Sequence, residues 1–307
     1  MAAWTAADIP PLDGRTAIVT GANSGLGYEV ALELARHGAA VTMVARDASR
    51  GAGALDRLRA ELTDANATLA VADLATLSSV RAFAMEWLAG GAPVDLLVNN
   101  AGVMALPRQT TVDGFERQFA TNHLGHFALT GLLLPALRPE ARVVAVSSGV
   151  AQIGRIDFDD LQGERRYWRW GAYAQSKLAN LLFAFELDRR ATAAGRALMS
   201  VAAHPGFAAT NLQAASSRGQ QHDWRAEAAA LSARLFGQSA AAGALPLLCA
   251  ATAPDVHGGE YYGPSGPWSM WGAPTIVAPP RHALDADVAA RLWTVSERLT
   301  GVTIDAF

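Results

Sequence analysis

The stretch TAIVTGANSGLG, residues 16–27, decides the fold of this 307-residue chain. Its apolar, β-branched first half reads as a strand, and an amphipathic helical pattern follows the glycines and stops at Gly38. Gly21 permits a sharp turn off the strand, Gly25 permits close approach of a pyrophosphate, and Gly27 permits tight packing of helix against strand. The helix N-terminus offers unpaired amide groups and its positive dipole end to an anion, and no Gly-Lys-Ser/Thr follows as in a Walker A loop. The turn is therefore predicted to bind a dinucleotide through Gly21, Asn23, Ser24, Gly25, Leu26 and Gly27.

The first two-thirds of the chain repeat this alternation of strand and helix. The strand candidates are continuous apolar runs with little polar alternation, which is typical of a sheet covered on both faces. Repeated strand–helix units predict parallel strands joined by right-handed crossovers. The predicted strands are Thr16–Thr20, Ala40–Ala45, Thr68–Ala72, Asp95–Asn99, Arg142–Ser147 and Met199–Ala203, and the predicted helices are Leu26–His37, Ala52–Leu62, Leu77–Leu88, Gly114–Leu134 and Tyr173–Arg190. The predicted fold class is α/β, a doubly wound parallel sheet of the Rossmann type, in a single domain over residues 1–307 with its core at about 14–206.

The last third departs from this alternation. Residues 207–237 are rich in Ala, Ser, Gln and Arg and read as a helical excursion, and a further helix is expected over Ser239–Thr252. The segment Gly258–Pro274 is dense in Gly, Pro, Tyr and Trp, as segments that wall a pocket or an interface often are. We therefore expect residues of about 207–275 to form a helical, aromatic extension that covers the substrate.

Composition argues against several classes of protein. Apolar residues make up 51% of the chain and charged residues 17%, which predicts a folded core rather than disorder. A net charge of -3 without a basic cluster argues against a nucleic-acid or anionic membrane partner. Cys249 has no partner for a disulfide, and His123 and His126 lack the further ligands that zinc sites usually need, so no metal is expected.

The expected location is the cytoplasm. Residues 1–12 lack the basic start and apolar region of a signal peptide. The longest apolar stretch, Ala128–Leu137, is far shorter than the roughly 20 residues that span a bilayer.

The tip of the second predicted strand distinguishes between the two nicotinamide dinucleotides. An acid at this position usually holds the ribose 2′-hydroxyl, but this chain has Ala45 there. Arg46 follows, and its guanidinium suits a 2′-phosphate. Asp47 is an alternative ribose ligand two positions on, although a helix N-cap is the favoured role for it. NADP(H) is therefore predicted over NAD(H).

Tyr173 and Lys177 are candidates for acid/base chemistry. Separated by four positions on a helix, they project from the same face. A neighbouring ammonium favours the phenolate and is expected to lower the phenol's pKa from about 10. Ser148, at the end of a predicted strand, could hydrogen-bond a substrate oxygen, and Asn122 could hold a water that relays protons to Lys177.

These residues together resemble the short-chain dehydrogenase/reductase family over nearly the whole chain. The matching motifs are TGANSGLG (20–27), Asp73-Leu74, NNAG (99–102), Asn122, Ser148, YAQSK (173–177) and His204-Pro205-Gly206. The resemblance implies a catalytic tetrad of Asn122, Ser148, Tyr173 and Lys177, with Ser148 favoured over Ser147 by its separation from Tyr173. It also implies cofactor contacts from Asp73, Leu74, Asn99, Ala101, Gly102, Tyr173, Lys177, Pro205, Gly206 and Thr210, beside Arg46 and the glycine turn.

Three further stretches resemble the retinol-dehydrogenase-like and WW-domain-oxidoreductase-like branch of the family: TNHLGHF (121–127), LQGE (161–164) and SKLAN (176–180). In this branch the stretch between the serine and the tyrosine is long. Here it covers Gly149–Ala172, carries Tyr167, Trp168 and Trp170, and is expected to overhang the substrate. Membrane-bound members begin with an apolar anchor that this sequence lacks, so retinol is not carried over as the substrate.

The function expected is NADP-dependent hydride transfer between nicotinamide and the carbonyl or alcohol of a bulky, hydrophobic small molecule. Candidate pocket residues, which could equally pack the core or an interface, are Met104, Leu106, Phe207, Trp224, Trp268, Met270 and Trp271. One alternative is a catalytically silent NADP-binding sensor or interaction protein of the same fold. Another is a sugar-nucleotide epimerase or dehydratase, although these usually have a Gly-x-x-Gly-x-x-Gly turn. A homo-oligomer, dimer or tetramer, is compatible with the family, and the direction of the reaction stays open.

Overall fold

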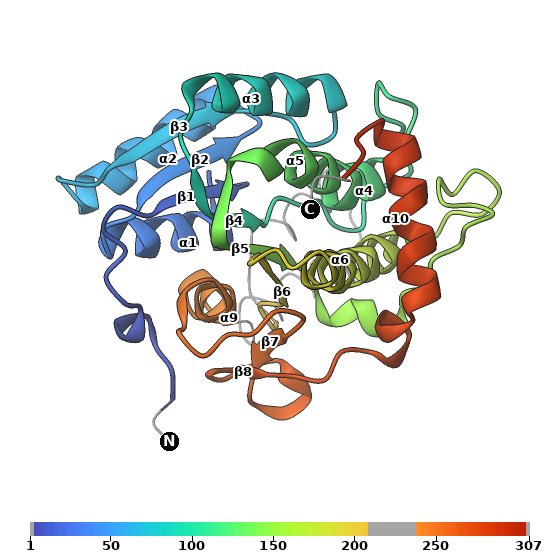
Figure 1. Cartoon of the computed structure of the whole chain (residues 1–307). Coiled ribbons are helices and arrows are strands. Elements are labelled where there is room, and N and C mark those ends of the chain that lie inside the picture. Colours follow the sequence, from blue (N-terminus) through green and yellow to red (C-terminus); the bar gives the residue numbers. More distant parts are fainter. Residues whose placement is uncertain (1–2, 208–237, 305–307) are drawn as a thin grey trace, which may run out of the picture.

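The structure, a computed structural model, describes residues 3–207 and 238–304. An eight-stranded sheet runs through its centre in the order β3-β2-β1-β4-β5-β6-β7-β8 (Figure 1). All neighbouring strands are parallel except β8, which is antiparallel to β7. The strands are β1 (Thr16–Thr20), β2 (Ala40–Ala45), β3 (Ala67–Val71), β4 (Val94–Asn99), β5 (Leu137–Val146), β6 (Met199–Ala203), β7 (Tyr261–Pro264) and β8 (Pro274–Ile276). The strand order reverses between β1 and β4, which is where open α/β sheets bind their ligands.

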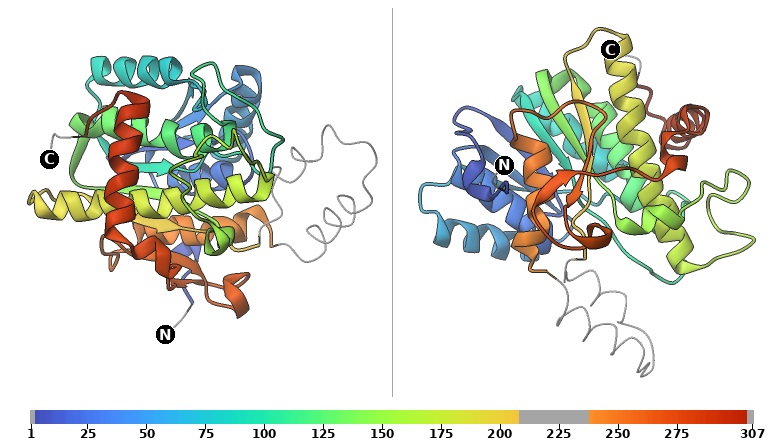
Figure 2. Two further views of the ribbon diagram at one scale, coloured as in Figure 1. Left: turned by 90° about the vertical axis from the view of Figure 1, so that its right-hand side faces the viewer. Right: turned by 90° about the horizontal axis from the view of Figure 1, so that it is seen from below.

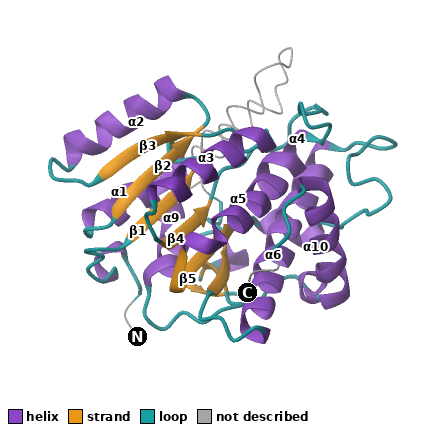
Figure 3. Cartoon of the chain, turned by 45° about the horizontal axis from the view of Figure 1, so that its top comes forward, coloured by secondary structure: helices purple, strands orange, loops and turns teal. Residues whose placement is uncertain are grey.

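Helices cover both faces of the sheet (Figure 3). The α-helices are α1 (Gly25–Arg36), α2 (Ala48–Glu61), α3 (Leu77–Gly90), α4 (Arg117–Phe119), α5 (Gly125–Leu133), α6 (Arg169–Ala193), α9 (Ala240–Thr252) and α10 (Ala286–Thr300). Alternate side chains of β1 enter opposite layers: Ala17 and Val19 pack with α1, α2 and α9, whereas Ile18 packs with α3, α5 and α6. The predicted doubly wound α/β fold is therefore confirmed.

Several predicted elements differ from the structure in detail. The strands β1, β2 and β6 have the predicted bounds, while β5 begins five residues before the predicted Arg142, at Leu137. The single helix predicted over residues 114–134 is divided into α4, a π-helical turn over Ala120–Leu124, and α5. Because π turns cluster at functional sites, the position of this turn around Asn122 is informative. The β7–β8 pair was not predicted, because Gly- and Pro-rich strands this short lack a clear pattern. Helix α10 was missed although Asp285 caps its start and Gly301 its end.

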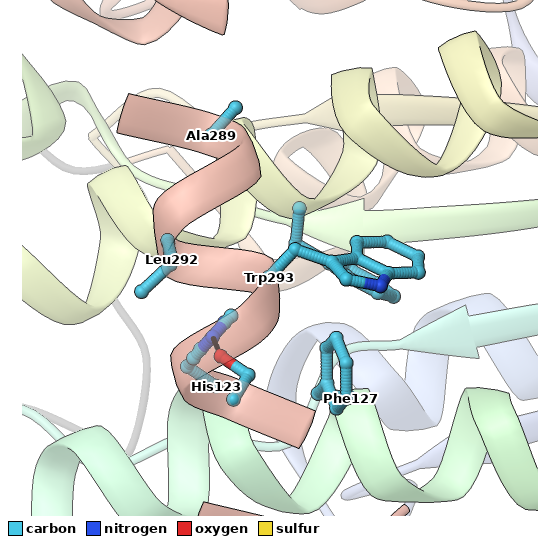
Figure 4. A pocket seen from close by; sticks show the side chains of 7 residues that line it. His123, Phe127, Ala289, Leu292 and Trp293 are labelled. Atoms are coloured by element: carbon cyan, nitrogen blue, oxygen red, sulfur yellow. Dashed lines mark hydrogen bonds between the residues drawn. The ribbon is translucent and has the colours of Figure 1, made fainter. Parts of the chain in front are cut away.

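Helix α10 closes the outer side of α5 and α6 (Figure 2). Its Trp293 is buried, with ring centroids 5.1 Å from Phe127 and 5.9 Å from Phe183, and with the Arg190 guanidinium 4.5 Å from its own ring. His123 lies in the same cluster and bonds Ser296 at 2.9 Å (Figure 4). This aromatic cluster belongs to the core. In the part of the chain that the structure describes, no helix combines the length and apolarity needed to span a bilayer.

Candidate active site

The carboxyl ends of β1 and β4 are joined by the side chain of Thr20. Its hydroxyl oxygen accepts hydrogen bonds from the amides of Asn100 and Ala101, both at 2.9 Å, and the Asn100 side-chain amide donates to the Thr20 carbonyl at 2.7 Å. These bonds hold Gly21 against Ala101. Gly21 has φ +69°, and a Cβ there would lie 2.9 Å from the Ala101 Cα. Only glycine therefore fits this turn without displacing its neighbour.

The N-terminus of α1 continues the turn. Gly25 has φ 58°, and the N-cap residue Ser24 makes no side-chain capping bond. The first-turn amides are thus left for an anion, as in dinucleotide sites. A Cβ on Gly27 would collide with the Asn100 side chain and lie 2.5 Å from the Gly21 carbonyl. Helix and turn therefore approach each other as closely as the sequence predicted.

One buried oxygen beside this turn has no partner among the described residues. The Asn99 side-chain nitrogen donates to the Thr130 hydroxyl at 3.0 Å, but the Oδ1 of Asn99 is unpaired. An unpaired buried acceptor at the end of β4, next to a glycine turn with free amides, fits a bound dinucleotide that supplies a donor. The residues that would hold its phosphates are 21–27. Within that stretch Leu26 packs inward, and the Asn23 carbonyl accepts from Arg57 at 3.4 Å.

At the tip of β2 the three residues have separate roles. Ala45 is buried, Arg46 is exposed, and the Asp47 carboxylate caps α2 by accepting from the Arg50 amide at 3.0 Å. The N-cap role predicted for Asp47 is confirmed. Its carboxylate is therefore engaged in the helix cap.

The other predicted cofactor residues follow β3 and β6. The Asp73 carboxylate accepts from the Ala75 amide at 3.0 Å, and Leu74 is buried with its carbonyl against Gly125. After β6, the Pro205 carbonyl accepts from the Gln238 side chain at 2.6 Å, and Gly206 has φ +67°. Thr210 and Trp224 lie outside the described residues.

Three members of the predicted tetrad meet at the ends of β5 and α6. Ser148 hydrogen-bonds the Tyr173 phenol, and the Lys177 ammonium lies 5.9 Å from the centroid of the Tyr173 ring. The Lys177 ammonium also donates to the Val146 carbonyl at 2.9 Å. Ser147 instead donates to the Lys177 carbonyl at 2.8 Å. Thus Ser148 faces the phenol, and Ser147 fastens α6 to the sheet.

The electrostatics of this group differ from the prediction. Burial raises the pKa of Tyr173 to about 12, although its hydrogen bond with Ser148 opposes the rise. Burial also lowers the pKa of Lys177 to about 8. The prediction that Lys177 lowers the pKa of the phenol is wrong, because desolvation disfavours both charged forms.

Asn122, the fourth member, braces the site with its side chain. Its Oδ1 accepts from the Val103 amide at 2.8 Å, and its Nδ2 donates to the Val103 carbonyl and the Ser176 hydroxyl, both at 2.9 Å. The loop after β4 is thereby tied to α6. A Cβ on Gly102 would lie 3.2 Å from the Asn122 side chain and 3.5 Å from the Lys177 nitrogen, so Asn122, Gly102 and Lys177 are close neighbours. The bracing role of Ser176, inside YAQSK, was missed.

The insertion Gly149–Ala172 leads into the first turn of α6, and part of it packs against the rest of the protein. The Tyr167 hydroxyl is 2.9 Å from the Leu106 carbonyl and 3.0 Å from the Glu116 carboxylate. Tyr167 therefore anchors the insertion to Leu106 and Glu116, and the overhang expected of the insertion stays a prediction. Trp168 is exposed, whereas Trp170 is 37% exposed and its ring centroid lies 6.3 Å from that of Tyr173. Trp170 thus borders the phenol.

The β7–β8 hairpin brings further aromatic residues to the same edge of the sheet. Because β7 is parallel to β6 and β8 returns antiparallel, the connecting residues 265–273 lie at the carboxyl ends of the parallel strands. The Phe207 amide donates to the Met270 carbonyl at 3.0 Å, and Trp268 is 88% exposed. Met104, Leu106, Phe207, Met270 and Trp271 are half-buried.

Comparison with known proteins agrees with this geometry. Residues 15–221 match the model of the short chain dehydrogenase family. The chain is 41% identical over 305 residues to a polyprenol dehydrogenase of Mus musculus, covering 95% of this chain and 86% of the relative. It is 39% identical over 298 residues to a retinol dehydrogenase 12 of Mus musculus, covering 95% and 88%. A crystal structure of an uncharacterized protein from Mycobacterium Paratuberculosis has 45% identity and a TM-score of 0.80, covering 99% of both chains.

The fold and the arrangement of the site are those of an oxidoreductase of the short-chain dehydrogenase type. The chain belongs to the short-chain dehydrogenase/reductase family, in its retinol-dehydrogenase-like branch.

The glycine turn gives a test of dinucleotide binding. Gly27→Ala places a methyl group against the Asn100 side chain and the Gly21 carbonyl, so the turn must open. The Kd for NADPH, measured by fluorescence titration, should rise by at least about tenfold, or roughly 1.4 kcal/mol. The matched control is Gly53→Ala in α2, where a Cβ meets nothing within 4 Å. An unchanged Kd in Gly27→Ala would show that dinucleotides do not bind here.

The lowered pKa of Lys177 can be measured directly, because Lys177 is the only lysine in the chain. Protein labelled with carbon-13 at the lysine side chain should give one lysine signal. Since burial favours the neutral amine, that signal should titrate at about pH 8 rather than at 10.5. A midpoint near the ordinary value would mean that the ammonium is solvated rather than buried.

Proposed function

We propose that this protein is an NADP-dependent oxidoreductase that transfers a hydride between nicotinamide and a carbonyl/alcohol pair, with Tyr173 as the acid/base. The observation that carries the proposal is the hydrogen bond of Ser148 to a buried Tyr173 phenol, with the Lys177 ammonium beside that ring. These side chains lie at the carboxyl ends of the strands, next to the turn that would hold a dinucleotide. The nicotinamide, when bound, exchanges the hydride with the substrate carbon.

The protein's side chains supply the proton and hold the substrate oxygen. Ser148 and Tyr173 would both donate hydrogen bonds to the carbonyl oxygen, which stabilises negative charge as it develops there. A phenol whose pKa is raised to about 12 keeps its proton until an alkoxide forms and then delivers it. In the oxidative direction the phenolate would depend on added positive charge, which Lys177 can provide.

NADP(H) is the favoured cofactor because of the tip of β2. Asp47 is occupied as the cap of α2, and Ala45 offers no carboxylate to a ribose. Arg46 is exposed at the same tip and would pair with a 2′-phosphate.

A bulky, hydrophobic substrate is favoured by the aromatic surroundings of the phenol. Trp170 contacts the Tyr173 ring, and the 265–273 hairpin carries the exposed Trp268. Met104 and Phe207, both half-buried, are the other proposed lining residues. The names of the relatives, polyprenol and retinol dehydrogenases, also point to long apolar alcohols. Cytoplasmic location, freedom from membrane and a homo-oligomeric state stay predictions.

Removal of one hydroxyl tests the mechanism. Tyr173→Phe should reduce kcat for NADPH-dependent carbonyl reduction by at least about 100-fold, because general acid catalysis contributes roughly 10²–10⁴. The Kd for NADPH should stay near that of the wild type. The matched control is Tyr262→Phe on β7, which removes a hydroxyl that donates to the Glu260 carboxylate and should retain activity. Most activity remaining in Tyr173→Phe would reject the mechanism, and a wild type that binds NADPH but reduces no carbonyl would favour the silent sensor.

Arg46 tests the choice of cofactor. Arg46→Ala should raise the Kd for NADPH by about tenfold or more, since a charge-assisted hydrogen bond is worth roughly 1.5–3 kcal/mol. The Kd for NADH, which lacks the 2′-phosphate, should change little and serves as the internal control. Equal losses for the two cofactors would contradict the 2′-phosphate contact.

A further inference from the structure

His126 lies within the TNHLGHF stretch (121–127) but is not a member of the tetrad, and the resemblance gives it no role. It lies on α5, is 2% exposed, and uses both ring nitrogens. Its Nδ1 is 2.9 Å from the main-chain carbonyl of Asn122, and its Nε2 is 2.9 Å from the hydroxyl of Thr20. One imidazole therefore connects the π-helical turn that carries Asn122 to the strand end from which the glycine turn departs.

The hydrogen bonds determine which nitrogen carries the proton. The Asn122 carbonyl can only accept, so Nδ1 is the donor and Nε2 is the acceptor. The Thr20 oxygen already accepts two amides, from Asn100 and Ala101, and its own proton is free to point to Nε2. Its other acceptor, the Val98 carbonyl, is more distant at 3.3 Å. Burial lowers the pKa of His126 to about 4, which keeps this neutral arrangement at ordinary pH.

A second contact one helical turn along fixes the same helix to β4. The Thr130 hydroxyl donates to the His126 carbonyl at 2.8 Å and accepts from the Asn99 side chain at 3.0 Å. The otherwise apolar α5 thus contacts the ends of both strands at the switch point. By comparison His123, also buried on this segment, faces away and bonds Ser296 on α10.

We propose that His126 is a positioning residue that couples the dinucleotide turn to the acid/base group. Through Thr20 it holds the amides of Asn100 and Ala101, and hence the wall of the Gly21 turn. Through the Asn122 carbonyl it orients Asn122. The side chain of Asn122 in turn ties Val103 to α6 next to Lys177. This assignment rests on the proposed function. The dinucleotide turn and the acid/base group need to be positioned together only if the protein transfers a hydride and a proton in one reaction.

Two substitutions separate the two contacts. The side-chain nitrogen of Asn is as many bonds from Cα as Nδ1, so His126→Asn can still donate to Asn122 but cannot reach Thr20. The terminal group of Gln matches Nε2, so His126→Gln can still accept from Thr20 but loses Asn122. His126→Phe removes both contacts and replaces the imidazole by a somewhat larger aromatic ring. His123→Phe is the matched control, because it removes a buried imidazole three residues away that bonds Ser296 on α10 and contacts neither Thr20 nor Asn122 through its side chain.

The first measurement uses the protein without cofactor. Amide hydrogen exchange at Asn100 and Ala101 should accelerate in His126→Asn and His126→Phe, and stay at the wild-type rate in His126→Gln and His123→Phe. The single lysine signal of Lys177 should shift in His126→Gln and His126→Phe but not in His126→Asn. The exchange rates thus report on the contact of His126 with Thr20, and the lysine signal reports on its contact with Asn122.

The second measurement separates binding from turnover. His126→Asn should raise the Kd for NADPH by about tenfold, the effect of losing one hydrogen bond, with kcat near the wild type. His126→Gln should do the reverse, and His126→Phe should show both losses. Identical defects in the Asn and Gln variants, or wild-type exchange and Kd in His126→Phe, would overturn the proposal. If the wild type itself neither bound NADPH nor reduced a carbonyl, the proposed function would fail, whereas the exchange rates would still report on the His126 contacts.

Discussion

The site depends on the hydrogen bonds by which the Thr20 hydroxyl joins the carboxyl ends of β1 and β4. Neighbouring loops at a switch point leave the sheet in opposite directions, so nothing in the regular β-ladder keeps them together. Thr20 supplies that link by accepting the amides of Asn100 and Ala101. Gly21, with its positive φ and its close approach to Ala101, lies directly beside this link. The glycine turn is thus defined by a contact between residues about 80 positions apart in the chain.

Burial sets the chemistry of the neighbouring acid/base group. The chain contains 24 arginines but a single lysine, and that lysine is Lys177. An arginine at this position would stay charged, since its guanidinium does not lose a proton in proteins. Lysine can release a proton when desolvated, and here its pKa falls to about 8. The single lysine of this arginine-rich chain thus lies where release of a proton from a buried cation is chemically useful.

The sequence predicted the parts of the fold and site that local pattern controls. Six strands were found because each is an apolar run next to a helix, and the glycine turn and the Tyr173–Lys177 pair were found because their spacing carries their geometry. What could not be predicted depends on partners far along the chain. Tyr167 bonds Leu106 and Glu116, which are 61 and 51 positions away, and no local pattern indicates these contacts. The roles of His126 and Ser176 likewise follow from tertiary contacts, and the rise in the pKa of Tyr173 follows from burial that spacing does not reveal.

The β7–β8 hairpin has a consequence for how such a protein can change over generations. The strand β8 is three residues long, forms the edge of the sheet and carries Pro274. Few other contacts in the protein therefore depend on its exact sequence. Insertions or deletions at the hairpin tip would leave the remaining ladder, the glycine turn and the proton-transfer side chains in place. New substrate preferences can therefore arise by drift in the length and side chains of this tip, while selection holds the reaction centre constant.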